Sequence, residues 1–241
     1  PLAAGTTATP TPVDAATDWQ SVSAADSHTC AIKTDGSLYC WGDNARSQLS
    51  GLPGFRTEPT LVGGGVWTAV SAGDVNTCAI RQDRRLWCWG DNVHGQVGNG
   101  ATSASPVGVP VEVSGSSTDW IAVSVEGTHA CGIREVGGTG AGTLWCWGDY
   151  RQGQLGIGTV STDQSTPQQV GTAVNWTKVT AGLYHTCGMQ GSTLSCWGGN
   201  AFGELGDGST STQLAPEPLP GTWVTVTAGW QETCGGRATP S

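Results

Sequence analysis

The stretch that decides the fold runs from Trp67 to Gly98. It reads Trp67-Thr-Ala-Val-Ser-Ala-Gly73, Asn76-Thr-Cys78-Ala-Ile80, Leu86-Trp-Cys88-Trp-Gly-Asp-Asn92 and Gly95-Gln-Val-Gly98. The same order of residues starts again at Trp19, Trp120 and Trp176, and its first part starts at Trp223. A repeat of about 50 residues with Trp-Gly dipeptides and Gly-containing turns is typical of a β-propeller blade.

Each repeat offers four short strands, which is the number that a propeller blade requires. Trp67–Ala72, Thr77–Arg81 and Arg85–Trp89 are rich in β-branched, aromatic and alternating apolar residues. Pro59–Val62 is a weaker fourth strand, and its proline suits the edge of a sheet, where a missing N–H is tolerated.

We therefore predict an all-β fold, with residues 1–241 forming a single β-propeller domain of four complete blades and one split blade. The fifth repeat breaks off after its second strand, within Thr233-Cys-Gly-Gly236. Residues 4–13 align with 207–219, so we expect residues 1–18 to complete the last blade. Two alternatives stay open: the repeats belong to a larger propeller, or another chain pairs with the unfinished sheet edge.

The cysteines share one hairpin register in all four complete repeats. If Cys30 faces Cys40, then Ile32 faces Leu38, and the same rule aligns a cysteine pair and an apolar pair in each later repeat. Facing residues on antiparallel strands are close enough for a disulfide. We predict four bridges, which join Cys30 to Cys40, Cys78 to Cys88, Cys131 to Cys146, and Cys187 to Cys196, and leave Cys234 unpaired.

Paired cysteines at this density favour an oxidising compartment over buried free thiols in a reducing one. No Cys-x-x-Cys pair is present, which disfavours zinc. Charged residues make up 12% of the chain, and 10 Lys+Arg stand against 19 Asp+Glu, for a net charge of −9. So few cations exclude a basic surface for nucleic acid, and no apolar run reaches the roughly 20 residues needed for membrane insertion.

These repeats resemble those of the regulator of chromosome condensation family. The resemblance rests on Ser27-His-Thr-Cys30, Trp41-Gly-Asp-Asn44, Gly182-Leu-Tyr-His-Thr186, Trp197-Gly-Gly-Asn200, Gly153-Gln-Leu-Gly156 and Gly203-Glu-Leu-Gly206. It implies a β-propeller, and most members have seven blades. The cysteine pair departs from the nuclear members and resembles a secreted or cell-surface branch, so we expect a secreted, extracellular or cell-surface protein.

Two sets of polar residues recur at equivalent positions. His28, His129 and His185 precede the first cysteine of their hairpins, and the resemblance implies that they tie neighbouring strands rather than bind metal. Asp43, Asp91 and Asp149 follow Trp-Gly, where we expect them to cap backbone N–H groups of the turn. No hydrolase, zinc-protease or phosphate-loop motif is present, so we predict no enzyme activity, no metal and no cofactor.

Aromatic residues that vary between repeats are the best candidates for a binding surface. They are Trp87, Trp145, Tyr184 and Trp230, which we expect at one rim, although packing between blades is the alternative. We predict an extracellular, non-catalytic scaffold that binds a protein or an extracellular-matrix component. The alternatives are a carbohydrate-binding module that recognises glycans and a secreted enzyme inhibitor. Asn175-Trp-Thr177 makes Asn175 a glycosylation candidate.

Overall fold

The computed structural model describes residues 12–51, 54–159 and 162–237. All the regular elements in these ranges are β-strands, and no helix there is long and apolar enough to cross a membrane. Blade 1 consists of β1 (Trp19–Ala24), β2 (His28–Lys33), β3 (Leu38–Gly42) and β4 (Arg56–Val62). Blade 2 consists of β5 (Trp67–Ala72), β6 (Asn76–Arg81), β7 (Leu86–Asn92) and β8 (Ser103–Glu112).

The remaining strands repeat this order. Blade 3 consists of β9 (Trp120–Glu126), β10 (His129–Glu135), β11 (Gly142–Gly148) and β12 (Gln164–Gln169). Blade 4 consists of β13 (Trp176–Ala181), β14 (His185–Gln190), β15 (Thr193–Gly198) and β16 (Gln213–Pro218). A single bridge between Gly142 and Trp176 joins the sheets of blades 3 and 4. The half-blade contains only β17 (Trp223–Ala228) and β18 (Thr233–Arg237).

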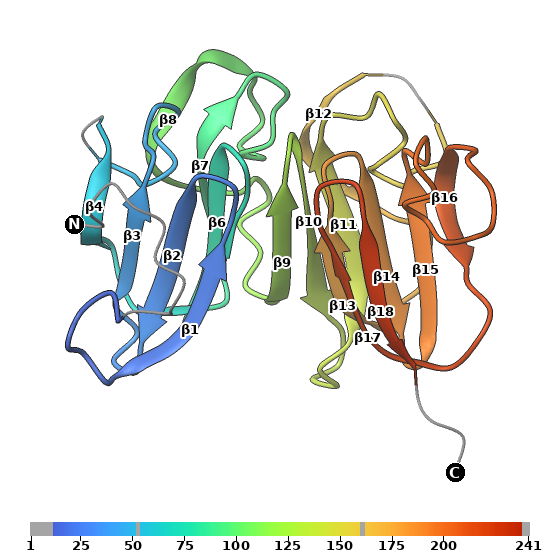
Figure 1. Cartoon of the computed structure of the whole chain (residues 1–241), viewed down its shortest axis with the longest axis horizontal. Coiled ribbons are helices and arrows are strands. Elements are labelled where there is room, and N and C mark those ends of the chain that lie inside the picture. The colour runs from blue at the N-terminus through green and yellow to red at the C-terminus, as the bar shows by residue number, and fades with distance from the viewer. Residues whose placement is uncertain (1–11, 52–53, 160–161, 238–241) are drawn as a thin grey trace.

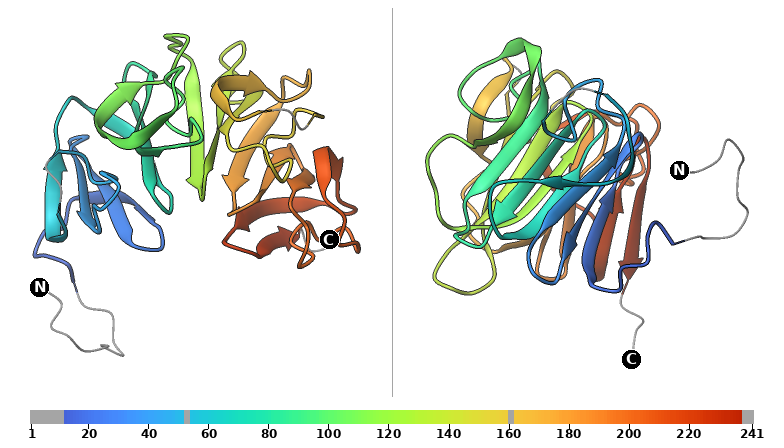
Figure 2. Two further views of the ribbon diagram at one scale, coloured as in Figure 1. Left: turned by 90° about the horizontal axis from the view of Figure 1, so that it is seen from above. Right: turned by 90° about the vertical axis from the view of Figure 1, so that its left-hand side faces the viewer.

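The blades follow one another along an open arc (Figures 1 and 2). The first strand of each blade contacts the first strand of the next, and blade 1 and the half-blade lie at opposite ends of the arc. The predicted all-β architecture of repeated blades is confirmed. Residues 1–11 lie outside the described residues, and 12–18 contain no strand, so their predicted role in completing the last blade stays a prediction.

The predicted hairpin register is confirmed in every complete blade. In blade 2, Cys78 faces Cys88 and Ile80 faces Leu86. The equivalent pairs face each other in blades 1, 3 and 4. All four predicted disulfides are present, each with a Cα–Cα distance of 4.1 Å. Cys234 is the free cysteine, and it is exposed.

The hydrophobic core is divided into clusters between neighbouring blades. Between blades 1 and 2, Leu38, Leu49 and Val62 of the first pack against Trp67 and Trp89 of the second. The next two interfaces repeat this set of three aliphatic residues and two tryptophans. The later tryptophan of each pair also donates its indole N–H to a glutamine carbonyl of the preceding blade, at 2.8 to 3.0 Å: Trp89 to Gln48, Trp147 to Gln96, Trp197 to Gln154.

Histidines add a second bond between blades, as the resemblance implied. The Nε2 atoms of His28, His129 and His185 each lie 2.8 Å from a threonine Oγ1 of the next blade: Thr77, Thr186 and Thr233. The hydroxyl of Thr77 donates to the carbonyl of Gln48, so His28 Nε2 must carry the proton of the shared bond. Burial lowers the pKa of His28 to about 4 and that of His129 to about 3.

Neutral buried histidines make the fold sensitive to acid. An unfolded histidine binds a proton below pH ~6.5, whereas folded His129 stays neutral until about pH 3. Stability is therefore lost as the pH falls through this window. We expect the wild type to lose about 2 kcal/mol more unfolding free energy than His129→Gln between pH 7 and pH 4.5. Urea titrations at both pH values measure the difference, and equal losses would contradict the assignment.

The interface between blades 2 and 3 lacks the histidine–threonine bond on both sides. Asn76 stands in the histidine position, where both polar side-chain atoms are buried without a partner. Ala130 stands in the threonine position and is fully buried. The histidine and the threonine are thus replaced together at this interface, and Asn76 keeps two buried polar atoms without a partner.

Restoring both residues should restore the bond. We expect Asn76→His and Ala130→Thr together to raise the unfolding free energy by about 1 kcal/mol more than the sum of the two single changes. A double-mutant cycle of thermal unfolding measures this coupling. Additive single effects would show that the two positions do not interact.

Candidate interaction face

One end of the blades carries most of the long loops, and we call it the loop face. It consists of the turns after the first strands (25–27, 73–75, 127–128, 182–184, 229–232) and the loops after the third strands (43–50, 93–102, 149–157, 199–212). It lies at the upper ends of the strands in Figure 1.

The Trp-Gly-Asp-Asn segments shape the longer loops. Asp149 accepts the N–H of Arg151 at 2.9 Å, and Asp43 and Asp91 accept equivalent N–H groups, as predicted for turn caps. The next residue ties the loop to its own far end, since Asn92 Oδ1 accepts the N–H of Val97 at 3.1 Å. These bonds fix the loops by local hydrogen bonding, so the residues between them are free to vary.

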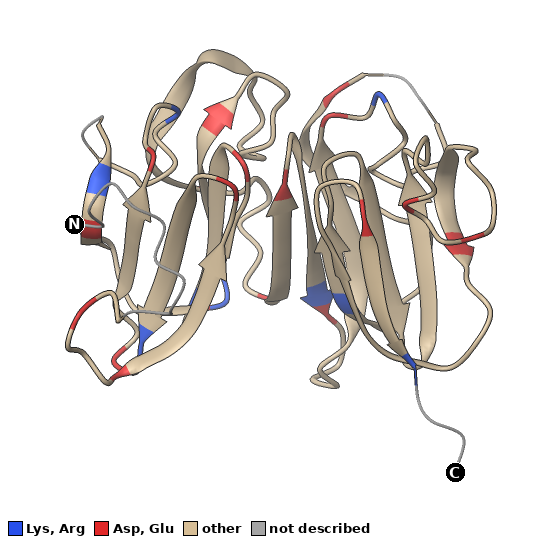
Figure 3. Cartoon of the chain, in the orientation of Figure 1, with Lys and Arg blue, Asp and Glu red and all other residues tan. Residues whose placement is uncertain are grey.

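Acidic side chains gather on the loop face of blades 1 to 3. Asp26 and Asp74 lie in equivalent turns and Glu126 ends β9 just before the next such turn, and the three act on one another electrostatically. Burial, with the neighbouring charges of Asp74 and Asp26, raises the pKa of Glu126 to about 7. Burial, together with Asp26, also raises the pKa of Asp74. Figure 3 shows acidic positions at both ends of the strands and several lysines and arginines at the lower end, where Lys33, Arg84 and Arg134 pair with acidic side chains.

Aromatic side chains gather on the loop face of blade 4 and the half-blade. Tyr184, Phe202 and Trp230 are 40%, 72% and 64% exposed. Leu183, next to Tyr184, donates its N–H to the carbonyl of Trp230, and Tyr184 accepts the N–H of Gly199 at the start of the loop that carries Phe202. The three aromatic side chains therefore belong to one connected part of the loop face.

The structure divides the four predicted binding residues between two places. Tyr184 and Trp230 lie on the loop face, whereas Trp87 and Trp145 lie at the opposite end of the blades, half-buried. Arg81 lies 3.8 Å from the ring centroid of Trp87, and Arg134 lies 5.1 Å from that of Trp145. The expectation of a single rim is therefore wrong. The third strand of each blade begins at the end away from the loop face, and Trp87 and Trp145 lie no further than the middle of β7 and β11.

Sequence reasoning missed Phe202. It occupies the variable loop position that holds Arg46 in blade 1 and His94 in blade 2. Comparing this position across repeats would have found it.

A second missed group connects the loops of blades 2 and 3. Ligand atoms of His94, Asp149 and Asp163 lie within 4.8 Å of one another. Arg151 lies among them, 2.7 Å from Asp149 and 3.2 Å from His94, and His94 also bonds Asp163 at 2.7 Å. Burial would raise the pKa of Asp149, but hydrogen bonds from Arg151 lower it below its usual range. Since the guanidinium already neutralises Asp149, the geometry fits an ion-pair network better than a metal site.

The glycosylation candidate Asn175 is exposed, and its Oδ1 accepts a hydrogen bond from Gln190 Nε2 at 2.7 Å.

Comparison with protein-family models assigns these repeats. Two models of the regulator of chromosome condensation repeat match residues 19–48 and 67–96, and 83–133 and 141–189, which together exceed half of the chain. The chain belongs to the regulator of chromosome condensation repeat family.

Solved structures show the same fold at low sequence identity. Human WBSCR16 is 22% identical, with a TM-score of 0.80 over 92% of this chain and 58% of its own. Prp20p from Saccharomyces cerevisiae is 17% identical, with a TM-score of 0.83 over 94% of this chain and 57% of its own. The ectodomain of the Physcomitrella patens receptor kinase CR4 is 20% identical, with a TM-score of 0.53 over 90% of this chain and 50% of its own. The chain thus spans little more than half the length of these relatives.

The raised pKa of Glu126 in this member of the regulator of chromosome condensation family gives a test of the acidic group. A folded pKa near 7 means that ionising Glu126 costs stability, a cost that is absent below pH ~4.5 and complete above pH 7. We expect Glu126→Gln to raise the unfolding free energy by about 1 kcal/mol at pH 8 and to leave it unchanged at pH 4. Glu217→Gln, at an exposed position, should change stability little at either pH; an equal gain in both variants would contradict the explanation.

Proposed function

We propose that this protein is an extracellular, non-catalytic scaffold that binds a protein partner through its loop face. The observation that carries the proposal is that three exposed aromatic side chains and a group of three carboxylates lie on the same face, in different blades. Aromatic residues are enriched at protein interfaces, and an acidic group complements a partner with positive charge. The proposed partner segment is therefore basic, with apolar side chains among its lysines and arginines.

The disulfides support the extracellular part of the proposal. Four bridges are typical of proteins that fold in an oxidising compartment. One structural relative is described as the entire ectodomain of a receptor kinase. A secreted or cell-surface location would also let Asn175 carry a glycan.

The binding partners of a structural relative support a protein partner rather than a small substrate. The structure of Prp20p is described together with its binding to Gsp1p and histones. Gsp1p and histones are ligands of Prp20p. For this chain they favour a protein as the class of ligand, without favouring any particular protein. A matrix protein that presents a basic segment fits the proposal equally well.

Selection from a displayed library of random peptides tests this proposal. On the oxidised protein, we expect enrichment of peptides that combine Lys or Arg with apolar residues. Binding of the selected peptides should fall at least about tenfold in Trp230→Ala or Phe202→Ala and weaken in Asp74→Asn.

Phe55→Ala is the matched control, because Phe55 is 65% exposed on blade 1, at the other end of the arc from Phe202. It should leave binding unchanged. Failure to enrich such peptides would contradict the proposal. Binding on a glycan array that depends on Trp230 would favour the carbohydrate-binding alternative instead.

A further inference from the structure

A pocket of about 400 Å³ lies at the junction of blades 2 and 3, at the end of the blades opposite the loop face. The segment that links β8 to β9 forms one wall, and strands of blade 3 form the others. The lining combines indole rings, a guanidinium group, hydroxyl groups and a proline ring: Trp120, Trp145, Arg134, Ser114, Ser117, Thr166 and Pro167, with Gly115.

The indole ring of Trp145 has a fixed orientation in this pocket. Its N–H donates to the hydroxyl oxygen of Thr143 at 2.9 Å. The Trp145 side chain is half-buried, so part of it remains accessible from the pocket. The face of an indole ring is electron-rich and attracts the weakly positive C–H groups of a ligand. Trp145 is therefore a preformed platform for an apolar ligand face.

Arg134 lies beside this ring, and its charge is neutralised. Its Nε and Nη2 atoms donate to the two carboxylate oxygens of Asp119 at 2.9 and 3.0 Å. The guanidinium carbon lies 5.1 Å from the centre of the Trp145 ring. A guanidinium has five N–H groups, of which these two bonds use two and leave three. Arg134 can therefore donate hydrogen bonds to a ligand without offering an unpaired charge.

Blade 2 shows what the aspartate does. There Val66 takes the place of the aspartate, and the guanidinium carbon of Arg81 lies 3.8 Å from the centre of the Trp87 ring. Cation–π attraction draws this guanidinium over the indole. In blade 3 the carboxylate holds the equivalent arginine further from its ring, so that ring stays available to a ligand.

Hydroxyl groups complete the polar side of the pocket. Those of Ser114 and Ser117 have no hydrogen-bond partner among the described residues. The hydroxyl of Thr166 accepts a hydrogen bond from Nε2 of Gln168 at 3.1 Å and keeps its own proton to donate. Hydroxyl groups both donate and accept, and they carry no charge. Arg134 is the one charged residue in the described lining, so the pocket is electrically neutral once Asp119 is counted.

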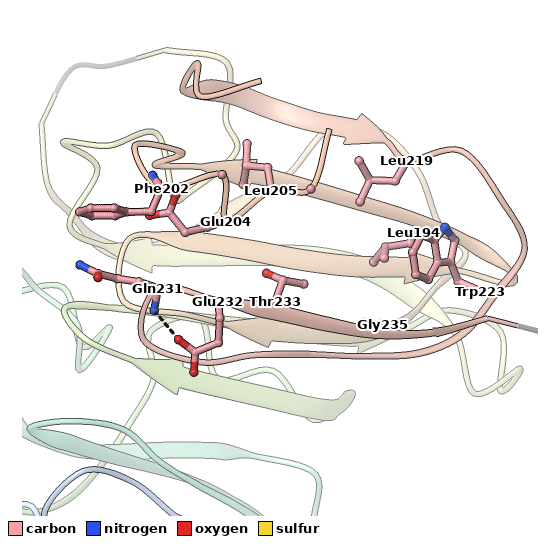
Figure 4. Close-up of a pocket in the computed structure, with 12 residues that line it drawn as sticks. Leu194, Phe202, Glu204, Leu205, Leu219, Trp223, Gln231, Glu232, Thr233 and Gly235 are labelled. Atoms are coloured by element: carbon pink, nitrogen blue, oxygen red, sulfur yellow. Dashed lines mark hydrogen bonds between the residues drawn. The ribbon is translucent and has the colours of Figure 1, made fainter. Parts of the chain in front are cut away.

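Other grooves in the described chain differ in charge. A pocket of about 320 Å³ in blade 1 is built from the equivalent tryptophan, cation, aromatic ring and proline: Trp19, Lys33, Tyr39 and Pro59. It carries Asp14 and Glu58 where the pocket of blade 3 carries hydroxyl groups. The groove beside Trp223 (Figure 4) also has carboxylates in its walls, those of Glu204 and Glu232. The neutral lining therefore distinguishes the pocket of blade 3 and favours an uncharged ligand.

We propose that this pocket binds a neutral saccharide. A sugar ring has a face of C–H groups and an edge of hydroxyl groups that donate and accept. The C–H face packs on Trp145, the sugar oxygens accept N–H groups of Arg134, and the sugar hydroxyls bond the serine and threonine hydroxyls. An acidic sugar is disfavoured, because its carboxylate competes with Asp119 for the guanidinium. The pocket and the loop face lie at opposite ends of the blades, so saccharide binding is independent of the proposed protein partner.

An array of neutral and uronic-acid oligosaccharides tests the proposal, followed by calorimetric titration with the neutral oligosaccharide that gives the strongest signal. We expect binding of neutral oligosaccharides. Trp145→Ala should weaken it at least about tenfold, and Ser117→Leu should weaken it by filling the pocket without removing a core contact. Asp119→Asn leaves the guanidinium charge unpaired and should add binding of uronic-acid oligosaccharides, which a loss of folding would not produce.

Trp87→Ala is the matched control, because Trp87 holds the same position in blade 2 and Arg81 lies over its ring. It should leave saccharide binding unchanged, as should Trp230→Ala on the loop face. Thermal unfolding of each variant separates a loss of binding from a loss of the fold. The proposal is overturned if no neutral oligosaccharide binds, if binding survives both Trp145→Ala and Ser117→Leu, or if it depends on Trp230 instead.

Discussion

Each complete blade after the first is held to the one before it by a tryptophan of its third strand. The indole ring packs on three aliphatic side chains of the preceding blade, and its N–H donates to a glutamine carbonyl there. Burial of about 200 Å² of aromatic surface contributes roughly 5 kcal/mol as an upper bound, against about 1 kcal/mol for the hydrogen bond. Packing therefore drives the association of blades, and the hydrogen bond fixes its orientation.

This contact explains why other parts of the sequence are what they are. At two of the three interfaces the residue beside the indole is glycine, and a Cβ at Gly98 or Gly156 would collide with the ring; in blade 1, Ser50 holds the equivalent position with the same left-handed φ. The disulfide lies next to the tryptophan in the same hairpin and holds it in register. The asparagine of each Trp-Gly-x-Asn segment binds the loop that carries the glycine. Side chains that do not serve this contact are the ones that vary, and several of them form the loop face.

The division between repeated and varying residues also sets what could be predicted from the sequence. The hairpin register and the disulfides follow from local spacing, so four similar repeats predict them four times, and the aspartate turn caps recur in three of the four. Of the four residues predicted to bind, the structure brings Tyr184 and Trp230 together on the loop face and places Trp87 and Trp145 at the other end of the blades. Which end a residue occupies depends on strand direction, which the repeat pattern already contains. By contrast, the network of His94, Arg151 and Asp163 joins two blades through unrepeated loop residues, and nothing in the spacing indicates it.

The same contact accounts for the different character of the two ends of the arc. Blade 1 presents Trp19 and Trp41 as a half-buried pair, 6.2 Å apart, with no blade before them in the described chain. The half-blade end presents three leucines with one tryptophan. One end therefore offers the aromatic half of the inter-blade contact, and the other offers the aliphatic half. Because these halves are complementary but unlike, the inter-blade contact gives the arc a direction.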